Sequence, residues 1–317
     1  KRPGVRITFE SASSQSLLRQ YATSHLGICT GDYPRFGRVF WELPVVGDQW
    51  VWQQTSVEST VRIGGLSTLL LWQGGRGDLY QALCDRLGVD GIYQWLRGEE
   101  AWGKRGVLIT ATRDLPCTLY FGHSFDNNVT VLTIDDEDVL AAVWVFCESG
   151  GLSEEVRRYN QQLKITDQSF VEAPFDLAHW QRVAQEKYPN GLPKPHSDDP
   201  TQWLFNGHPK GSDHPLQVAV ARLVGYRWPR QTGSSFPDCP ALGPDGLEAH
   251  ADADGNVPLA SIAGEASAAD RLRALLKDAY GEEWSAAKLK ELLRDWDSLE
   301  DWLLDGFFEE HCRIFHQ

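Results

Sequence analysis

Eleven of the sixteen prolines in this 317-residue chain fall between residues 186 and 262. Proline has no backbone N–H and a fixed φ, so a segment this rich in proline forms neither a long helix nor a central strand. Within it, only PLQVAVARLVGY at 215–226 has the apolar spacing of a helix. We therefore expect 177–262 to be a loop-rich connecting or wrapping segment with one helix.

The residues before this segment, 1–176, alternate between strand and helix patterns, which predicts an α+β domain. A helix is expected at 136–150, where acidic residues suit its N-terminus, and Ser153 is a candidate cap for a second helix over 153–165. The other expected elements are strands at 5–10, 105–122 and 127–134, a short helix at 16–22, hairpins within 36–72, and a helix at 78–88 that ends at Gly88.

The last segment, 263–317, has three amphipathic patterns, and each begins on a serine that suits a helix N-cap. These serines are Ser267, Ser285 and Ser298. The fold class we expect is therefore α+β, with a β-rich first domain, a Pro/Gly-rich connector and a small acidic helical region. Residues 1–130 hold 13 Lys and Arg against 12 Asp and Glu, a net charge of +1, whereas 131–317 hold 17 against 32, a net charge of −15. The near-neutral first part permits a local basic face despite the overall charge of −14.

Six scattered cysteines without metal-ligand spacing, and no long apolar run, predict a cytoplasmic protein with reduced thiols and no metal site. The absence of methionine and the start at KRPGVRITFE suggest an internal piece of a longer chain.

Candidate enzyme motifs are incomplete. GHPKGSDHP at 207–215 brings His208, Lys210 and Asp213 together, but two residues separate Lys210 from Asp213 where phospholipase-D-type nucleases have four. The Pro-Cys pair at Cys117 lacks the Glu-Asn-Val partner of cytosine methyltransferases, and the glycines at 74–77 lack the spacing of a phosphate loop. The sequence predicts no catalytic residue, although a binding role remains open.

Three clusters in the first domain combine basic, small and aromatic residues: 30–38, 97–106 and 157–166. Arginine suits phosphates and guanine edges, small residues allow a close backbone approach, and aromatic rings stack on bases. The alternative is a packed surface on which the arginine stems cover apolar side chains, and we favour core packing for Phe36, Phe40 and Trp41. The candidate DNA-binding residues are Thr30, Asp32, Arg35, Arg38, Trp102, Lys104, Arg105, Arg157, Arg158 and Lys164.

The stretch GICTGDYPRFGRVFWEL at 27–43 resembles the start of the target-recognition region of large adenine-specific DNA methyltransferases. These are the PglX-like enzymes of BREX and DISARM phage-defence systems, related to fused restriction-methyltransferases. AWGKRGVLIT, LYFGHSFDNNVTVL and the long stretch 171–209 are similar to further family segments and follow in the same order.

The resemblance implies sequence-specific recognition of double-stranded DNA for a phage-defence or restriction-modification enzyme. The family's catalytic domain binds S-adenosylmethionine and carries an Asn/Asp-Pro-Pro-Tyr/Phe motif for the flipped adenine. No Asn-Pro-Pro or Asp-Pro-Pro tripeptide occurs here, so the resemblance implies a specificity portion without its own cofactor. The implied partners are DNA and the methyltransferase domain. A module that docks on other defence subunits is the alternative function.

Overall fold

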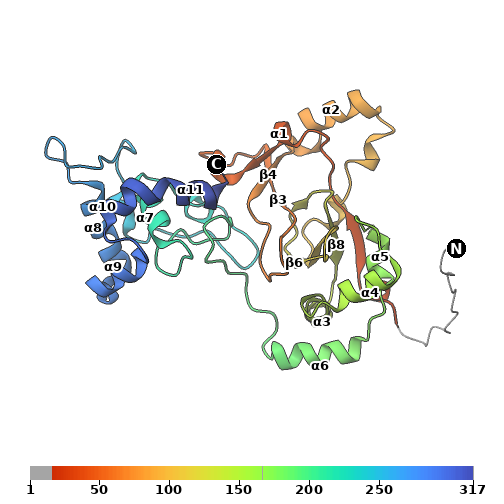
Figure 1. Ribbon diagram of the computed structural model, residues 1–317. Helices are drawn as coiled ribbons and strands as arrows, with labels where there is room; N and C mark the ends of the chain where they lie inside the picture. The colour runs from red at the N-terminus through yellow and green to blue at the C-terminus, as the bar shows by residue number, and fades with distance from the viewer. Residues whose placement is uncertain (1–15, 166, 317) are drawn as a thin grey trace, which may run out of the picture. The chain divides into compact units, whose positions relative to one another are not determined.

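The computed structural model describes residues 16–165 and 167–316 (Figure 1). The chain forms two compact units. The first runs to Arg38 and resumes over Asp48–Pro193, and the second combines Val39–Gly47 with the chain from Lys194 onward. The architecture is mixed α+β with a C-terminal helical region, as predicted. The strand expected at 5–10 lies outside the described residues, and the segment 16–22 holds a short 3-10 helix, Leu18–Gln20.

Two four-stranded sheets account for the named strands. The first has the antiparallel order β1 (Thr23–Leu26), β8 (Val129–Thr133), β5 (Gly106–Thr110) and β6 (Cys117–Tyr120). The second has the order β2 (Gly37–Val39), β4 (Thr68–Leu71), β3 (Trp50–Gln54) and β7 (Ser124–Phe125). Strands β3 and β4 are antiparallel, which confirms a hairpin within 36–72, while β3 and β7 are parallel.

Both faces of the first sheet are buried, because every residue of β5, β6 and β8 is buried. Such continuous apolar runs are typical of strands covered on both sides. Helix α3 (Glu137–Glu148) packs on β5 and β6, and its residues 140–147 are all buried. The helix expected at 136–150 is confirmed, with Glu137 and Asp138 in its first turn, and Asp136 caps it because its carboxylate accepts hydrogen bonds from two N–H groups of that turn. The remaining helices of the first unit are α1 (Tyr33–Phe36), α2 (Asp78–Leu87), α4 (Gly151–Tyr159), α5 (Asp167–Val171) and α6 (Leu177–Lys187).

The helix expected at 153–165 begins and ends earlier than predicted. Its first residue is Gly151, its N-cap is Gly150 at a φ of 86°, and no side chain caps it. A Cβ on Gly151 would lie 2.6 Å from the Phe146 ring, so only glycine fits where α3 passes into α4. The prediction that Ser153 caps this helix was therefore wrong. Because α4 ends at Tyr159, Lys164 lies in the following loop.

The second unit contains the helices α7 (Pro215–Leu223), α8 (Ala268–Tyr280), α9 (Ala286–Leu293), α10 (Leu299–Asp301) and α11 (Phe307–Phe315), with a π-helical turn at Trp302–Gly306. The three predicted serine caps are confirmed: Ser267, Ser285 and Ser298 each accept a hydrogen bond from the N–H three residues later. The core of the unit includes Leu272, Leu276 and Trp302, all nearly inaccessible to solvent.

The proline-rich segment folds around aromatic side chains. Trp203 and Trp228 are fully buried, and Trp228 donates from its ring N–H to the carbonyl of Pro200 at 2.8 Å. The short segment Val39–Gly47 also belongs to this unit. Within it, the centre of the Trp41 ring lies 5.3 Å from that of the Phe315 ring. All six cysteines lie within the described residues and are free thiols.

Candidate nucleic-acid interface

Thr30 and Asp32 line an open cavity of about 530 Å³ in the first unit. They belong to the loop between β1 and α1. The Ile28 N–H donates to the carbonyl of Phe125 and holds this loop against the turn before β8, while the Cys29 N–H donates to the carbonyl of Trp95, just after the 3-10 helix Ile92–Gln94. A Cβ on Gly27 would lie 2.2 Å from the Asp126 carbonyl oxygen, so glycine is required for this close approach. The TGD sequence is therefore displayed at one end of the first sheet.

The opposite wall of the cavity is the turn Asp126–Asn128. The Asp126 carboxylate accepts a hydrogen bond from the Asn128 N–H at 2.9 Å, and burial raises the pKa of Asp126 despite the opposing effects of that bond and of Lys164. Lys164 donates from Nζ to the Asn127 carbonyl at 2.8 Å. We call this end of the first sheet the Asn127 end. It comprises the cavity, the loops 27–32 and 126–128, and Lys164.

Gln53 lies in β3 and is fully buried, yet neither atom of its side-chain amide has a hydrogen-bond partner. Gln53 is directly opposite Thr68, and alternation along the strand directs it to the same face as Thr55. Thr55 and Thr68 both line the cavity, so an unsatisfied amide lies on the face of the sheet beneath it.

Replacing Gln53 with Leu should raise the free energy of unfolding by about 1–2 kcal/mol, because a buried amide without partners is costly and Leu has a similar size. Urea denaturation measures the change. The matched control is Gln54→Leu, since Gln54 donates to the carbonyls of Gly64 and Leu119 at 3.0 and 2.8 Å and should lose stability. A Gln53→Leu variant that is destabilised as much as Gln54→Leu would contradict this account.

The arginines of the third cluster differ in their surroundings. Arg157 donates to the carbonyls of Gln162 and Arg113, so it fastens the loop after α4 to the loop after β5. Arg158 is exposed and pairs with Glu155 one helical turn away. Arg157 therefore has a structural role, while Arg158 and Lys164 present charge to solvent.

Arg35 and Arg38 lie in and just after α1. Arg38 donates to the carbonyls of Pro34 and Gly37, both at 2.6 Å, which commits its guanidinium to the backbone. Arg35 is exposed, with its guanidinium carbon 4.8 Å from the centre of the Phe36 ring. Phe36 and Phe40 are buried, which confirms core packing for both, and Trp41 is partly buried.

The second cluster spans the first sheet: Arg97 donates to the Gly27 carbonyl at 3.2 Å, beside the cavity, whereas Lys104 and Arg105 lie at the other end. Arg105 precedes β5, with its Nε 3.6 Å from the Glu137 carboxylate, and Lys104 is exposed. The ring of Trp102 packs at 5.1 Å from that of Trp72 within the core. The loop after β5 bonds to Ile165 and Asn128, so a full strand of about 20 Å separates Arg105 from the Asn127 end.

The structure thus brings Thr30, Asp32 and Lys164 together and places Lys104 and Arg105 apart from them, while Trp102 packs in the core. Gln53, Asn127 and Asn128 are not among the site residues predicted from the sequence. Two features of the sequence point to them. Gln53 belongs to the polar pair that ends the strand pattern WVWQQ, and Asn127 and Asn128 belong to the tight-turn pattern FDNN.

No protein-family model matches the chain, and no curated protein matches it either. Within the described ranges, no helix combines the length and the apolar character needed to cross a membrane.

Proposed function

We propose that this chain recognises double-stranded DNA as the specificity portion of an adenine-specific DNA methyltransferase, in the cytoplasm. The observation that carries the proposal is the Asn127 end, where hydroxyl, amide and carboxylate groups line one cavity beside Lys164. Amides pair with adenine edges, carboxylates accept from the amino groups of bases, and lysine contacts phosphates. S-adenosylmethionine would belong to a catalytic domain outside this chain.

The charge arrangement favours a specific orientation of the duplex. Asp32 and Asp126 repel phosphates from the cavity, whereas Lys164 and the exposed Arg35 lie outside it. A base edge would therefore point toward the cavity while the backbone lies along its rim. Lys104 lies about one strand length from the cavity, so it would contact the DNA only if the duplex runs along the sheet.

Replacing Lys164 or Arg35 with Ala should weaken duplex binding and reduce the slope of log K against log salt by about 1 each, because each variant loses one phosphate contact. Fluorescence anisotropy with a labelled duplex at several salt concentrations measures both quantities.

The exposed Lys277 in the second unit is the matched control, and Lys277→Ala should leave the slope unchanged. Lys104→Ala tests the other end of the sheet. Absence of duplex binding, or an unchanged slope in both Lys164→Ala and Arg35→Ala, would overturn the proposed interface.

A second candidate function is docking on another protein of a defence complex. Leu304 and Phe308 are 70% and 73% exposed and lie one helical turn apart, an unusual position for large apolar side chains. If the chain binds no DNA but associates with a methyltransferase subunit, and a Leu304→Ser/Phe308→Ser variant does not, this second function holds instead.

A further inference from the structure

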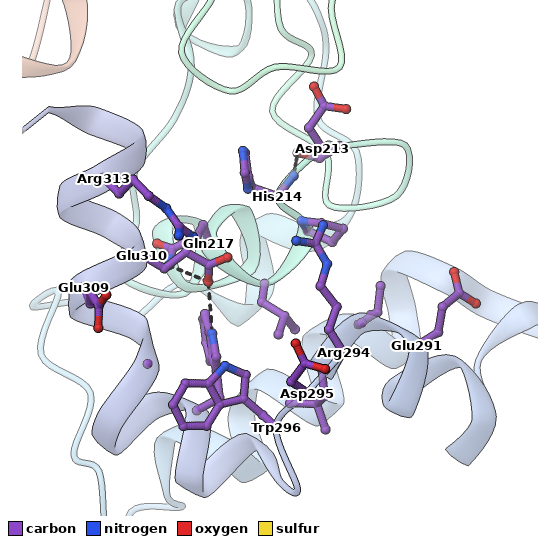
Figure 2. A pocket seen from close by; sticks show the side chains of 17 residues that line it. Asp213, His214, Gln217, Glu291, Arg294, Asp295, Trp296, Glu309, Glu310 and Arg313 are labelled. Carbon is purple, nitrogen blue, oxygen red and sulfur yellow. Dashed lines mark hydrogen bonds between the residues drawn. The ribbon is translucent and has the colours of Figure 1, made fainter.

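A second cavity, of about 520 Å³, lies within the second unit (Figure 2). Its walls come from the start of α7, the end of α9 with the residues that follow, and the π-helical turn with α11. The volume is within the range of sites for small molecules. None of the residues of the proposed DNA interface lines this cavity.

Two arginine side chains from different segments of the chain line the cavity. Arg294 follows α9 and Arg313 belongs to α11, and both side chains are exposed. Figure 2 shows them reaching toward the middle of the cavity from opposite sides, below His214. Among the residues that the structure describes, neither guanidinium has a hydrogen bond or an ion pair. Two such cations without partners in one cavity favour an anionic ligand.

The N-terminus of α7 adds a third source of positive potential. His214 is its N-cap residue, no side chain caps the helix, and Pro215 occupies the first turn. The N–H groups at the start of such a helix and the helix dipole attract anions. The Nδ1 atom of His214 is buried without a partner, so it is available to donate a hydrogen bond to a ligand.

Five carboxylates also line this cavity, and most of them are occupied or point elsewhere. Glu310 accepts hydrogen bonds from the ring N–H of Trp302 at 3.0 Å and from Gln217 at 3.3 Å, and Glu291 pairs with Lys288 at 2.8 Å. Figure 2 shows that Asp213 and Glu309 point away from the centre. Asp295 lies beside Arg294, and its carboxylate has no hydrogen bond or ion pair within the described part of the chain. The five are Asp213, Glu291, Asp295, Glu309 and Glu310.

The backbone is strained at Arg294, one of the two arginines that line the cavity. Arg294 has a φ of 55°, a left-handed conformation that is unfavourable for a residue other than glycine. Two residues of the π-helical turn Trp302–Gly306 also line the cavity, and a Cβ on Gly306 would be 2.3 Å from the Trp296 ring. Strained residues and π turns concentrate at functional sites, which supports a ligand-binding role for this cavity.

We propose that this cavity binds the phosphate group of a small phosphorylated molecule. Arg294 and Arg313 would contact the phosphate oxygens from two sides, and His214 and the first N–H groups of α7 would donate to the remaining oxygen. Asp295 would accept a hydrogen bond from a hydroxyl group of the ligand and disfavour a second phosphate. Trp296, which also lines the cavity, offers an aromatic surface to the rest of the molecule.

Isothermal titration calorimetry of the whole chain tests the proposal with three probes: inorganic phosphate, a nucleoside 5′-monophosphate and a sugar phosphate. We expect at least one phosphate ester to bind more tightly than inorganic phosphate, and the corresponding nucleoside without phosphate not to bind. Whichever ester binds more tightly, the nucleoside monophosphate or the sugar phosphate, identifies the class of ligand. Arg294→Gln and Arg313→Gln should each weaken binding about tenfold, the loss of one charge-assisted hydrogen bond.

Lys277→Gln removes the same charge from an exposed position outside this cavity and should not change the Kd. Arg294→Gly separates binding from folding, since glycine accepts the positive φ: its Tm should rise while its affinity falls about tenfold. The proposal is overturned if no phosphate probe binds at about 10 mM, or if both Gln variants bind like the unaltered protein. It is equally overturned if the nucleoside binds as tightly as its monophosphate.

Discussion

Replacing Asp245 with Ala is expected to lower the free energy of unfolding of the second unit by about 3–5 kcal/mol, the usual cost of breaking a buried ion pair. Its partner Arg222 is only 3% exposed and donates to both Asp245 oxygens, at 2.7 and 2.8 Å, and to the Gly207 carbonyl at 3.0 Å. Without Asp245 this buried guanidinium loses its main counter-charge. Urea denaturation followed by circular dichroism measures the effect.

Glu248 provides the control for that experiment. Its carboxylate is 3.7 Å from Arg222 and more exposed, so Glu248→Ala should cost less than about 1 kcal/mol. An Arg222→Met/Asp245→Leu double variant should recover most of the stability, because a well-packed apolar pair can replace a buried ion pair. Equal losses in Asp245→Ala and Glu248→Ala would show that the bidentate pair is not what holds this segment.

The same pair gives the second unit a defined acid sensitivity. Burial opposes ionisation of Asp245, but the hydrogen bonds from Arg222 and from the Leu247 N–H outweigh it and lower the pKa of Asp245 to about 2. Because the folded pKa lies below the unfolded one, the stabilisation is complete above the unfolded pKa and is lost as pH falls toward 2. The Asp245→Ala variant should lack this component of the acid transition.

Trp144→Ala should destabilise the first unit by about 3–5 kcal/mol, the range for removing a large aromatic side chain from a core. Trp144 lies in α3, is completely buried, and donates from its ring N–H to the Tyr188 hydroxyl at 3.3 Å. The midpoint of urea unfolding should fall accordingly. Trp144→Phe keeps most of the ring volume and loses the hydrogen bond, so it should cost clearly less; a loss as large as that of the Ala variant would show that the hydrogen bond dominates.

Local signals in the sequence predicted much of the secondary structure. The caps at Ser267, Ser285 and Ser298 were predictable because a cap depends on residues within one turn. The start of α4 was not, since Gly150 ends α3 in a left-handed conformation and α4 begins with no side-chain cap. In that case the close packing of Gly151 on Phe146 decides the boundary, and this contact has no sequence pattern.

The candidate interface could be predicted only in part. Thr30, Asp32 and Lys164 were recognised as polar or basic residues in short motifs, but their proximity depends on the antiparallel register of β1, β8 and β5. The same register places Lys104 and Arg105 a strand length away, which no spacing in the sequence could indicate. Gln53 could not be predicted as a site residue from the sequence, because a glutamine within a strand is common. Only the structure shows that its buried amide has no hydrogen-bond partner.

The aromatic contact between Trp41 and Phe315 joins two residues of one unit that are far apart in the sequence. During synthesis, Trp41 leaves the ribosome long before α11 does. The segment Val39–Gly47 must therefore wait for α11 before this ring contact can form. A nascent chain halted before α11 would carry the Trp41 ring without this partner, so the second unit cannot close around Trp41 while the first unit is being made.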